Sequence, residues 1–258
     1  MTIKLSDLDP DATPHAPGDK EATNAASAAL NEKLADLQER LYAEAKQSLL
    51  VVFQAMDTGG KDGAIKHVFH GVNPVGVHVA SFKAPTPIEL AHDFLWRVHE
   101  KTPAKGDIVI FNRSHYESVL IERVHDLVPK KTWKARYKQI NAFEEMLVAE
   151  GTTILKFFFH ISKDEQRDRL LARLDHADKT WKFNPEDVAE RRLWHDYMDA
   201  YEDAVNKTST KYAPWHVVPA NHKWYRNYFV SKTLVETLER MNPKYPTKDL
   251  SSFDRSEI

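Results

Sequence analysis

The chain has 258 residues, 42% of them hydrophobic, which is enough to bury one sizeable α/β core. It contains no cysteine, so disulfides, a thiolate nucleophile and a zinc–thiolate site are excluded. Its net charge of −2 provides no field that would attract nucleic acid, and no segment approaches the roughly 18 apolar residues of a membrane-spanning helix. We therefore expect a cytoplasmic protein without a nucleic-acid or membrane partner, in which local clusters of cations bind any anion.

The N-terminal part of the chain is predicted to contain an arm and a helix. Residues 1–22 are rich in Asp, Pro and Ala and lack a basic segment followed by an apolar stretch, so we expect a mobile arm. Four leucines then recur three or four residues apart, as on one face of a helix: Leu30, Leu34, Leu37 and Leu41. The amphipathic helix that they predict could pack on the domain or take part in a subunit contact.

Beyond this helix, apolar segments alternate with helical patterns, which predicts parallel strands joined by crossover helices. The expected strands span residues 49–55, 77–82, 107–112, 153–159 and 215–220. In such a sheet, ligands bind at the carboxyl ends of the strands. We expect one domain over residues 23–242, followed by a polar C-terminal tail over residues 243–258.

The first expected strand runs into a glycine-rich turn that carries a lysine and opens a helix. This turn is Asp57-Thr58-Gly59-Gly60-Lys61-Asp62-Gly63. Glycines let backbone N–H groups approach phosphate oxygens, while the helix N-terminus and Lys61 supply positive charge. The match to the usual P-loop pattern is incomplete, because Ala55 replaces its first glycine and Asp62 its hydroxyl residue. The order of strand, glycine loop, lysine and helix nevertheless favours phosphoryl chemistry over an ordinary strand-to-helix turn.

A second polar cluster, Asn112-Arg113-Ser114-His115-Tyr116-Glu117, follows the third expected strand. Parallel strands place it at the same sheet edge as the glycine loop. We therefore expect Arg113 to contact phosphate rather than to form only a salt bridge. His115 is the one histidine among thirteen to which we give a functional role.

The same two segments supply candidate metal ligands. P-loop proteins often have an acidic residue at the end of this strand that helps to hold the metal, whereas here Asn112 can bind the metal or orient one of its waters without adding charge. The negative charge around a metal ion would then come from Asp57, Asp62, Glu117 and the substrate phosphates.

Residues from about 162 to 210 are expected to form a lid. Ser162 and the Asn184-Pro185 pair are typical starts of two successive helices. Arg169 and Arg173 are four residues apart and share a face of the first helix. A cationic hairpin beside a phosphate loop could close over a transferring phosphoryl group and exclude water.

A basic stretch at residues 129–138 contains five cations and no acid. Lys130, Lys134 and Lys138 recur on one helical face, which could guide a polyanion, although a solvated face is the commoner explanation. Trp133 and Tyr137 lie between them at helical spacing, so they are more typical of packing residues than of a platform for nucleic-acid bases.

Taken together, these motifs resemble the polyphosphate kinase 2 family, and the likeness runs from about residue 30 to residue 242. Four segments carry it: the glycine loop at 57–63, the turn Ser81-Phe82-Lys83-Ala84-Pro85, the strand end at 112–117 and Trp181-Lys182-Phe183. The resemblance is closest to the class III members, in which the strand-end residue is Asn rather than Asp.

The resemblance implies a three-layer α/β/α P-loop kinase fold, similar to thymidylate kinase, with a parallel five-stranded sheet and a helical lid. It also implies reversible transfer of phosphoryl groups from inorganic polyphosphate to AMP and ADP, giving ADP and ATP. The implied cofactor is Mg²⁺, with Mn²⁺ as an alternative, and the implied assembly is a homo-oligomer, either a dimer or a tetramer.

The resemblance further implies roles for individual residues. Asp57 would hold the metal, Lys61 would bind the transferring phosphoryl group, and Arg113 would stabilise charge on its oxygens. Asn112 would meet the metal directly or through water, and Asp62 is a further candidate ligand. The residues expected on polyphosphate or other phosphates are Gly59, Gly60, Gly63, Lys61, Lys83, Arg173, Lys179 and Lys182. Those expected on the side of the acceptor nucleotide are Arg113, His115 and Glu117.

Three other functions remain open from the sequence. An ATP-dependent nucleoside or nucleotide kinase of the same fold would place an adenine pocket near Ala220-Asn221-His222-Lys223. A non-catalytic phosphate-binding module would account for the neutral Asn112 and the missing loop hydroxyl. A nucleic-acid kinase would use the basic stretch at 129–138. The tryptophans that could stack on a purine are Trp96, Trp181, Trp194 and Trp224, and the sequence does not choose among them.

Overall fold

The structure is a computed structural model that describes residues 2–249. Within these residues, five strands form one parallel sheet in the order β2-β3-β1-β4-β5. Their bounds are β1 Ser48–Ala55, β2 Val77–Ser81, β3 Ile108–Asn112, β4 Thr152–His160 and β5 Trp215–Pro219. The expected strands and their parallel arrangement are confirmed. Of the expected C-terminal tail, residues 250–258 lie outside the described part of the chain.

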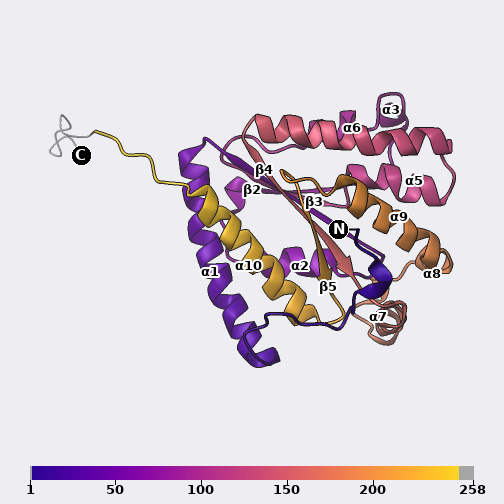
Figure 1. The fold of residues 1–258 in the computed structure, drawn as a ribbon. Helices are drawn as coiled ribbons and strands as arrows, with labels where there is room; N and C mark the ends of the chain where they lie inside the picture. Colours follow the sequence, from indigo (N-terminus) through magenta and orange to yellow (C-terminus); the bar gives the residue numbers. More distant parts are fainter. Residues whose placement is uncertain (1, 250–258) are drawn as a thin grey trace.

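Helices cover both faces of the sheet (Figure 1). On one side lie α1 (Lys20–Glu44), α2 (Lys61–Val68) and α10 (Lys223–Met241), and on the other α5 (Ile121–Val124), α6 (Lys130–Ala149) and α9 (Trp194–Thr208). The short helices α3 (Pro87–Leu90) and α4 (Trp96–His99) follow β2, while α7 (Lys163–Asp175) and α8 (Pro185–Arg192) follow β4. This is the three-layer α/β/α arrangement expected from the sequence.

The core lies against the central strand. Every residue of β1 is buried, because neighbouring strands flank it on both sides and helices cover both of its faces. The ring of Phe53 packs against those of Phe157 and Phe159 from β4, with centroids 5.5 and 5.2 Å away. On α1, Leu34 and Leu41 are fully buried. The leucine spacing in the sequence therefore marks a helix that packs on the domain.

The N-terminal segment, for which the composition predicts a mobile arm, contacts the domain in this structure. A 3₁₀ turn at Leu5–Asp7 buries Leu5, and the backbone N–H groups of Ile3 and Leu5 donate to Asn206 Oδ1 and Glu202 Oε2, each at 2.8 Å. Helix α1 then begins at Lys20, where Asp19 caps it by accepting from the N–H of Ala22. Polar side chains of α9 thus bind the start of this N-terminal segment.

The expected lid is also smaller than residues 162–210. Helix α9 belongs to the core layer, with Ala200, Ala204 and Val205 buried against it. The candidate lid is therefore the hairpin of α7, the 3₁₀ turn Thr180–Lys182 and α8.

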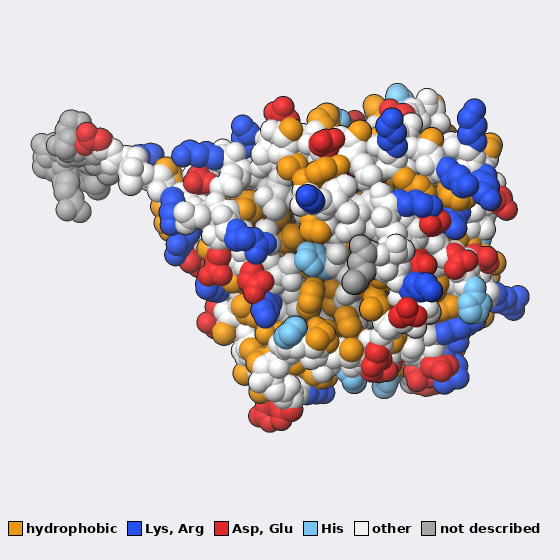
Figure 2. All heavy atoms as spheres, in the orientation of Figure 1, with side chains coloured by type: hydrophobic (Ala, Val, Ile, Leu, Met, Phe, Trp, Pro, Cys, Tyr) orange, Lys and Arg blue, Asp and Glu red, His pale blue; other side chains and the backbone are white. Residues whose placement is uncertain are grey.

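The face of the described chain in Figure 2 shows no large region of one charge. On the face in Figure 2, Lys and Arg side chains alternate with Asp and Glu, as the small net charge suggests. On α6, Trp133 and Tyr137 are buried, so they are packing residues and offer no exposed platform for nucleic-acid bases. Within residues 2–249, every helix is too short or too polar to cross a bilayer.

Candidate active site

The glycine loop turns tightly between β1 and α2. The N–H of Gly59 donates to the carbonyl of Met56 at 2.9 Å, and a Cβ on Gly59 would lie 2.5 Å from the Cβ of Ala55. Thr58 and Gly60 both have left-handed backbones, with φ of 61° and 94°. A left-handed Thr is uncommon, and such strain concentrates at ligand sites. The loop therefore reaches the start of α2 through two residues with left-handed backbones.

Lys61 is the first residue of α2 and is buried, with 9% of its surface exposed. Its ammonium donates to the carbonyl of Ala55 at 2.9 Å. Burial, followed by the nearby charge of Arg113, lowers the pKa of Lys61 to about 8, while Asp57 and two other acids oppose this shift. The lysine is therefore a desolvated cation held directly beneath the loop.

The end of β3 brings Arg113 to this loop. Asn112 pairs in register with Phe53 of β1, and the N–H of Arg113 donates to the Phe53 carbonyl at 3.2 Å. The guanidinium donates to Asp57 Oδ1 at 2.5 Å and lies 3.5 Å from Glu117. Arg113 also has a left-handed backbone, with φ of 61°. Arg113, Asp57 and Glu117, all expected in the site from the sequence, thus meet at the carboxyl edge of the sheet.

Two carboxylates at this edge stabilise the positive charge of Arg113. Glu117, as the largest influence, raises the pKa of Arg113 against the opposing effect of burial, and Asp57 adds to this increase. Tyr197 and Tyr201 of α9 face the same charges: burial is the main cause of their raised pKa, and both Glu117 and Asp57 add to it. The two tyrosines of α9 are therefore buried close to the charges of Glu117 and Asp57.

Asn112 contacts the loop from the other direction, because its amide donates to Asp62 Oδ1 at 2.5 Å. No cluster of three or more His, Cys, Asp or Glu side chains suited to a metal occurs within residues 2–249. Mg²⁺ commonly uses one or two carboxylates together with water and substrate phosphates. Asp57 and Asp62, each with one oxygen held by a hydrogen bond, fit that kind of site.

The first helix of the candidate lid contacts the loop through its buried face. Gln166 donates to the carbonyl of Asp57 at 3.1 Å, and Arg169 donates to the carbonyl of Thr58 at 3.0 Å. Arg169 also pairs with Glu165 at 2.6 Å. These residues fix the base of the hairpin on the loop, and the sequence predictions did not include them in the site.

The outer part of the hairpin holds the other predicted cations. Arg173 donates to Asp187 of α8 at 3.0 Å and to the carbonyl of Lys182 at 2.9 Å, so in this conformation it stabilises the hairpin. Lys179 and Lys182 are exposed in the connection. The structure thus leaves these lysines available to an anion and engages Arg173 within the hairpin.

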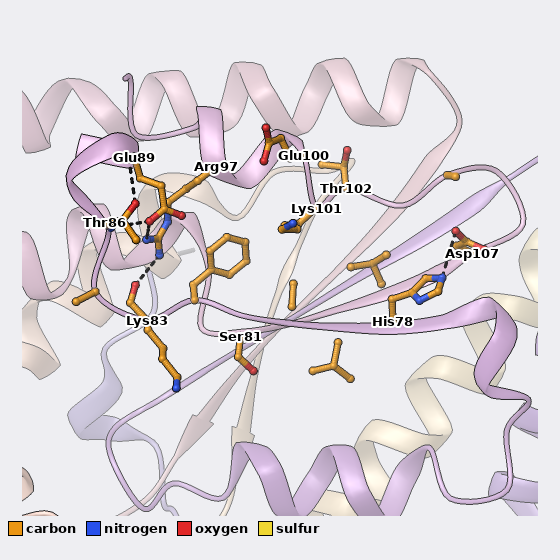
Figure 3. Close-up of a pocket in the computed structure, with 16 residues that line it drawn as sticks. His78, Ser81, Lys83, Thr86, Glu89, Arg97, Glu100, Lys101, Thr102 and Asp107 are labelled. Atoms are coloured by element: carbon orange, nitrogen blue, oxygen red, sulfur yellow. Dashed lines mark hydrogen bonds and ion pairs between the residues drawn. The ribbon is translucent and has the colours of Figure 1, made fainter. Parts of the chain in front are cut away.

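Lys83 lies at the end of β2, two strands away from the glycine loop. A cavity of about 690 Å³ runs along β2, and its lining extends from His78 to Lys83. The carbonyl of Lys83 accepts from Arg97 at 2.7 Å, while the lysine side chain points away from Arg97 and Glu89 (Figure 3). The lysine is exposed at the predicted sheet edge but does not join the cluster around Lys61.

The assignment of His115 to the acceptor side is wrong. Its side chain is fully buried, lies 3.3 Å from Glu144 and packs edge-on against Phe143. Glu144 in turn accepts from Lys156 at 2.6 Å and from the hydroxyl of Tyr116 at 2.8 Å. Burial lowers the pKa of His115, which keeps the ring neutral inside this network. The histidine therefore belongs to the core beneath the site.

The expected adenine pocket of an ATP-dependent kinase is also not apparent at residues 220–223. The carbonyls of Ala220 and Asn221 both accept from Arg169, at 2.6 and 3.1 Å. The first turn of α10 that follows contains Arg226, which packs on the glycine loop. Sequence reasoning missed this arginine, although its place after the fifth strand puts it at the predicted edge.

Comparisons with known proteins agree with this geometry. The family model described as "Polyphosphate kinase 2" matches residues 18–246. A protein of Meiothermus ruber named "AMP/ADP-polyphosphate phosphotransferase" is 58% identical, over 97% of this chain and 94% of that protein. An "ADP-polyphosphate phosphotransferase" of Rhodopseudomonas palustris is 49% identical, over 83% of this chain and 78% of that protein.

Solved structures give the same result. The crystal structure of polyphosphate kinase 2 from Arthrobacter aurescens TC1 superposes with a TM-score of 0.94 at 47% identity, covering 99% of this chain and 90% of that one. The fold, the loop and the strand-end cluster expected from the sequence thus occur together in one chain. The chain belongs to the polyphosphate kinase 2 family.

Proposed function

We propose that this protein transfers the terminal phosphoryl group of inorganic polyphosphate to AMP and to ADP, reversibly, as expected for a class III member. The observation that carries the proposal is the convergence of buried Lys61, Arg113 and Asp57 at the loop. Family membership and the names of the two relatives support the choice of substrates.

The loop and Lys61 bind and orient the phosphoryl group. Phosphoryl transfer needs little covalent help, so positioning and charge neutralisation supply most of the rate acceleration. The N–H groups at the start of α2 and the Lys61 ammonium lie on one side of the group that moves. Because Lys61 is desolvated, its charge acts more strongly on phosphate than it would in water.

Arg113 stabilises charge on the phosphoryl oxygens from the β3 side. Its guanidinium is held by Asp57 and Glu117, so its position is set before substrate arrives. The acceptor is itself a phosphate that is ionised at neutral pH, so no general base is needed. The burial of His115 agrees with direct in-line transfer and gives no support to a phosphohistidine route.

Asp57 and Asp62 would hold Mg²⁺ together with the substrate phosphates, and Mn²⁺ could replace it. When bound, such an ion neutralises charge on the phosphates. The contact from Asn112 fixes the Asp62 carboxylate and therefore acts through it. The exposed Lys179 and Lys182 are placed to attract polyphosphate as the hairpin closes.

We also propose that the protein works in the cytoplasm as a homo-oligomer, either a dimer or a tetramer. This proposal rests on the family resemblance and on the composition. Sedimentation of the purified protein would measure its subunit number, and a monomer that is fully active would contradict the proposed assembly.

The test of the activity uses the purified protein with Mg²⁺, long-chain polyphosphate and AMP, without ATP, and follows nucleotides by chromatography. We expect ADP to form first and ATP to follow, while Lys61→Ala gives neither. Omitting Mg²⁺ should abolish both products. Transfer from ATP without any transfer from polyphosphate would instead identify an ordinary nucleotide kinase, and phosphate binding without turnover would identify a non-catalytic module.

A further inference from the structure

Arg226 is a buried cation beside the glycine loop, and no acid within residues 2–249 forms an ion pair with it. It lies in the first turn of α10, with 2% of its surface exposed. Its Nε and Nη2 donate to the amide oxygen of Asn227 at 3.2 and 2.7 Å, a neutral acceptor. Its remaining nitrogen, Nη1, has no hydrogen-bond partner within the described chain. A buried guanidinium is normally paired with an acid, so this arrangement needs an explanation.

The unpartnered nitrogen lies against the loop itself. A Cβ on Gly60 would lie 2.0 Å from Arg226 Nη1, and a Cβ on Gly63 would lie 3.6 Å from Nη2. The guanidinium therefore occupies the space that a side chain at Gly60 would fill. Gly60 is required both by its left-handed backbone and by this arginine. The free donor is thus buried directly against the glycine loop.

Burial and a neighbouring cation destabilise the positive charge of Arg226. Burial, followed by the charge of Arg169, lowers the pKa of Arg226 to about 9. Burial and then Arg169 likewise lower the pKa of Lys223, three residues earlier on α10. Arg169 has Glu165 as its partner at 2.6 Å. Within residues 2–249, Arg226, Arg169 and Lys223 therefore share a single ion-paired acid, the Glu165 partner of Arg169. An anionic ligand would supply the missing negative charge.

A purely structural role accounts for only part of this arrangement. The Arg226 guanidinium lies 5.5 Å from the centroid of the Phe159 ring, a cation–π contact that stabilises the charged side chain weakly. Such a contact does not satisfy Nη1 and does not neutralise the charge. A ligand phosphate over Gly60 would do both.

The position of Arg226 also indicates which phosphate it binds. Arg113 follows β3 and Arg226 follows β5, and these strands lie on opposite sides of β1 in the sheet. In-line transfer places donor and acceptor on opposite sides of the moving group. With the acceptor beside Arg113, the donor lies toward Arg226. We propose, on the basis of the function proposed above, that Arg226 binds the inorganic polyphosphate donor through Nη1 and directs its chain toward Lys223.

The test compares Arg226→Gln with Arg226→Lys and with Arg240→Gln, a control on the exposed end of the same helix. The KM for polyphosphate and the KM for AMP are measured separately, and tripolyphosphate binding is measured by calorimetry without nucleotide. Loss of one charged contact should raise the KM for polyphosphate and the Kd for tripolyphosphate about tenfold or more in Arg226→Gln. Arg226→Lys should recover part of this loss, and the KM for AMP should change less than about twofold.

A second variant tests the proposal if Arg226→Gln fails to fold. Asn227→Asp places a carboxylate where Arg226 already donates, so it supplies the missing countercharge without removing the arginine. It should raise the Tm of the ligand-free protein and also raise the KM for polyphosphate. A higher Tm with an unchanged KM would mean that Arg226 is only structural and would overturn the proposal.

The remaining outcomes are equally decisive. A rise in the KM for AMP alone would place Arg226 on the acceptor side and would contradict the donor assignment. If the wild type fails to use polyphosphate, the proposed function is wrong, while calorimetry still tests whether Arg226 binds an oligophosphate. Tripolyphosphate binding unchanged in folded Arg226→Gln would refute the inference even if the activity is real.

Discussion

The glycine loop and the outer hairpin both present cations, but they hold them differently. Lys61 is buried and fixed on the carbonyl of Ala55, and Arg113 is held between two carboxylates by the end of a strand. In the hairpin, Lys179 and Lys182 lie exposed beside Trp181, which has 77% of its surface in solvent. The sheet edge thus supplies charge held by hydrogen bonds and ion pairs, whereas the hairpin lysines supply solvent-exposed charge.

This difference should separate residues that act in the transfer step from residues that bind polyphosphate. Charge that is oriented before substrate binds stabilises a transition state without reorganisation, while exposed charge is screened by water and salt. We therefore expect substitutions at the loop to lower kcat strongly and substitutions in the hairpin to change KM modestly. The following experiments test that division, from the largest expected effect to the smallest.

Lys61→Ala and Asp57→Asn should each lower the rate of transfer by on the order of 10³-fold or more, because each removes a fixed charge at the phosphoryl group. Initial rates with polyphosphate and AMP measure the effect, and circular dichroism checks that the variants are folded. Lys211→Ala, at an exposed lysine outside the basic stretch and the site, is the matched control and should keep the wild-type rate. Folded loop variants with near wild-type rates would contradict the site.

The pH dependence should report on Lys61. Because burial lowers its pKa to about 8, the free enzyme loses this positive charge as pH rises through that value. The kcat/KM for polyphosphate should fall about tenfold per pH unit above it. Bound phosphate stabilises the ammonium, so kcat should fall only at higher pH. A folded Lys61→Arg variant, which stays charged, should lose this dependence, and a flat wild-type profile up to pH 9.5 would refute the assignment.

The double variant Lys179→Ala and Lys182→Ala should raise the KM for polyphosphate by roughly three- to tenfold and leave kcat nearly unchanged, because exposed charges act mainly on encounter. The effect should shrink as salt increases. Steady-state kinetics at two ionic strengths would measure it. A large fall in kcat that persists at high salt would mean that the hairpin lysines contact the transferring group.

His115→Asn should have the smallest effect on the KM for AMP, less than about twofold, because the ring faces the core and not a substrate. Its main effect should be a lower Tm, since Glu144 and Lys156 would lose part of their buried network. Kinetics and thermal unfolding on the same preparation separate the two effects. An AMP-specific increase in KM at unchanged Tm would restore His115 to the acceptor side.

The candidate site residues that lie together as expected are those whose position follows from the backbone alone. A glycine loop after an apolar strand and a polar cluster after a parallel strand must meet at one edge, so Asp57, Lys61 and Arg113 converge as expected. His115 was misplaced because the direction of a side chain in a short 3₁₀ turn depends on distant partners, here Glu144 on α6 and Lys156 on β4.

The sequence by itself determined the five strands, their parallel direction and the loop that opens α2, because apolar periodicity and glycine conformations are local properties. Only the tertiary structure decided which charges are satisfied. It packed the N-terminal segment on α9, anchored α7 to the loop through Arg169 and left Arg226 Nη1 unpartnered against Gly60. The physical reason is that burial and pairing depend on neighbours that are far apart along the chain.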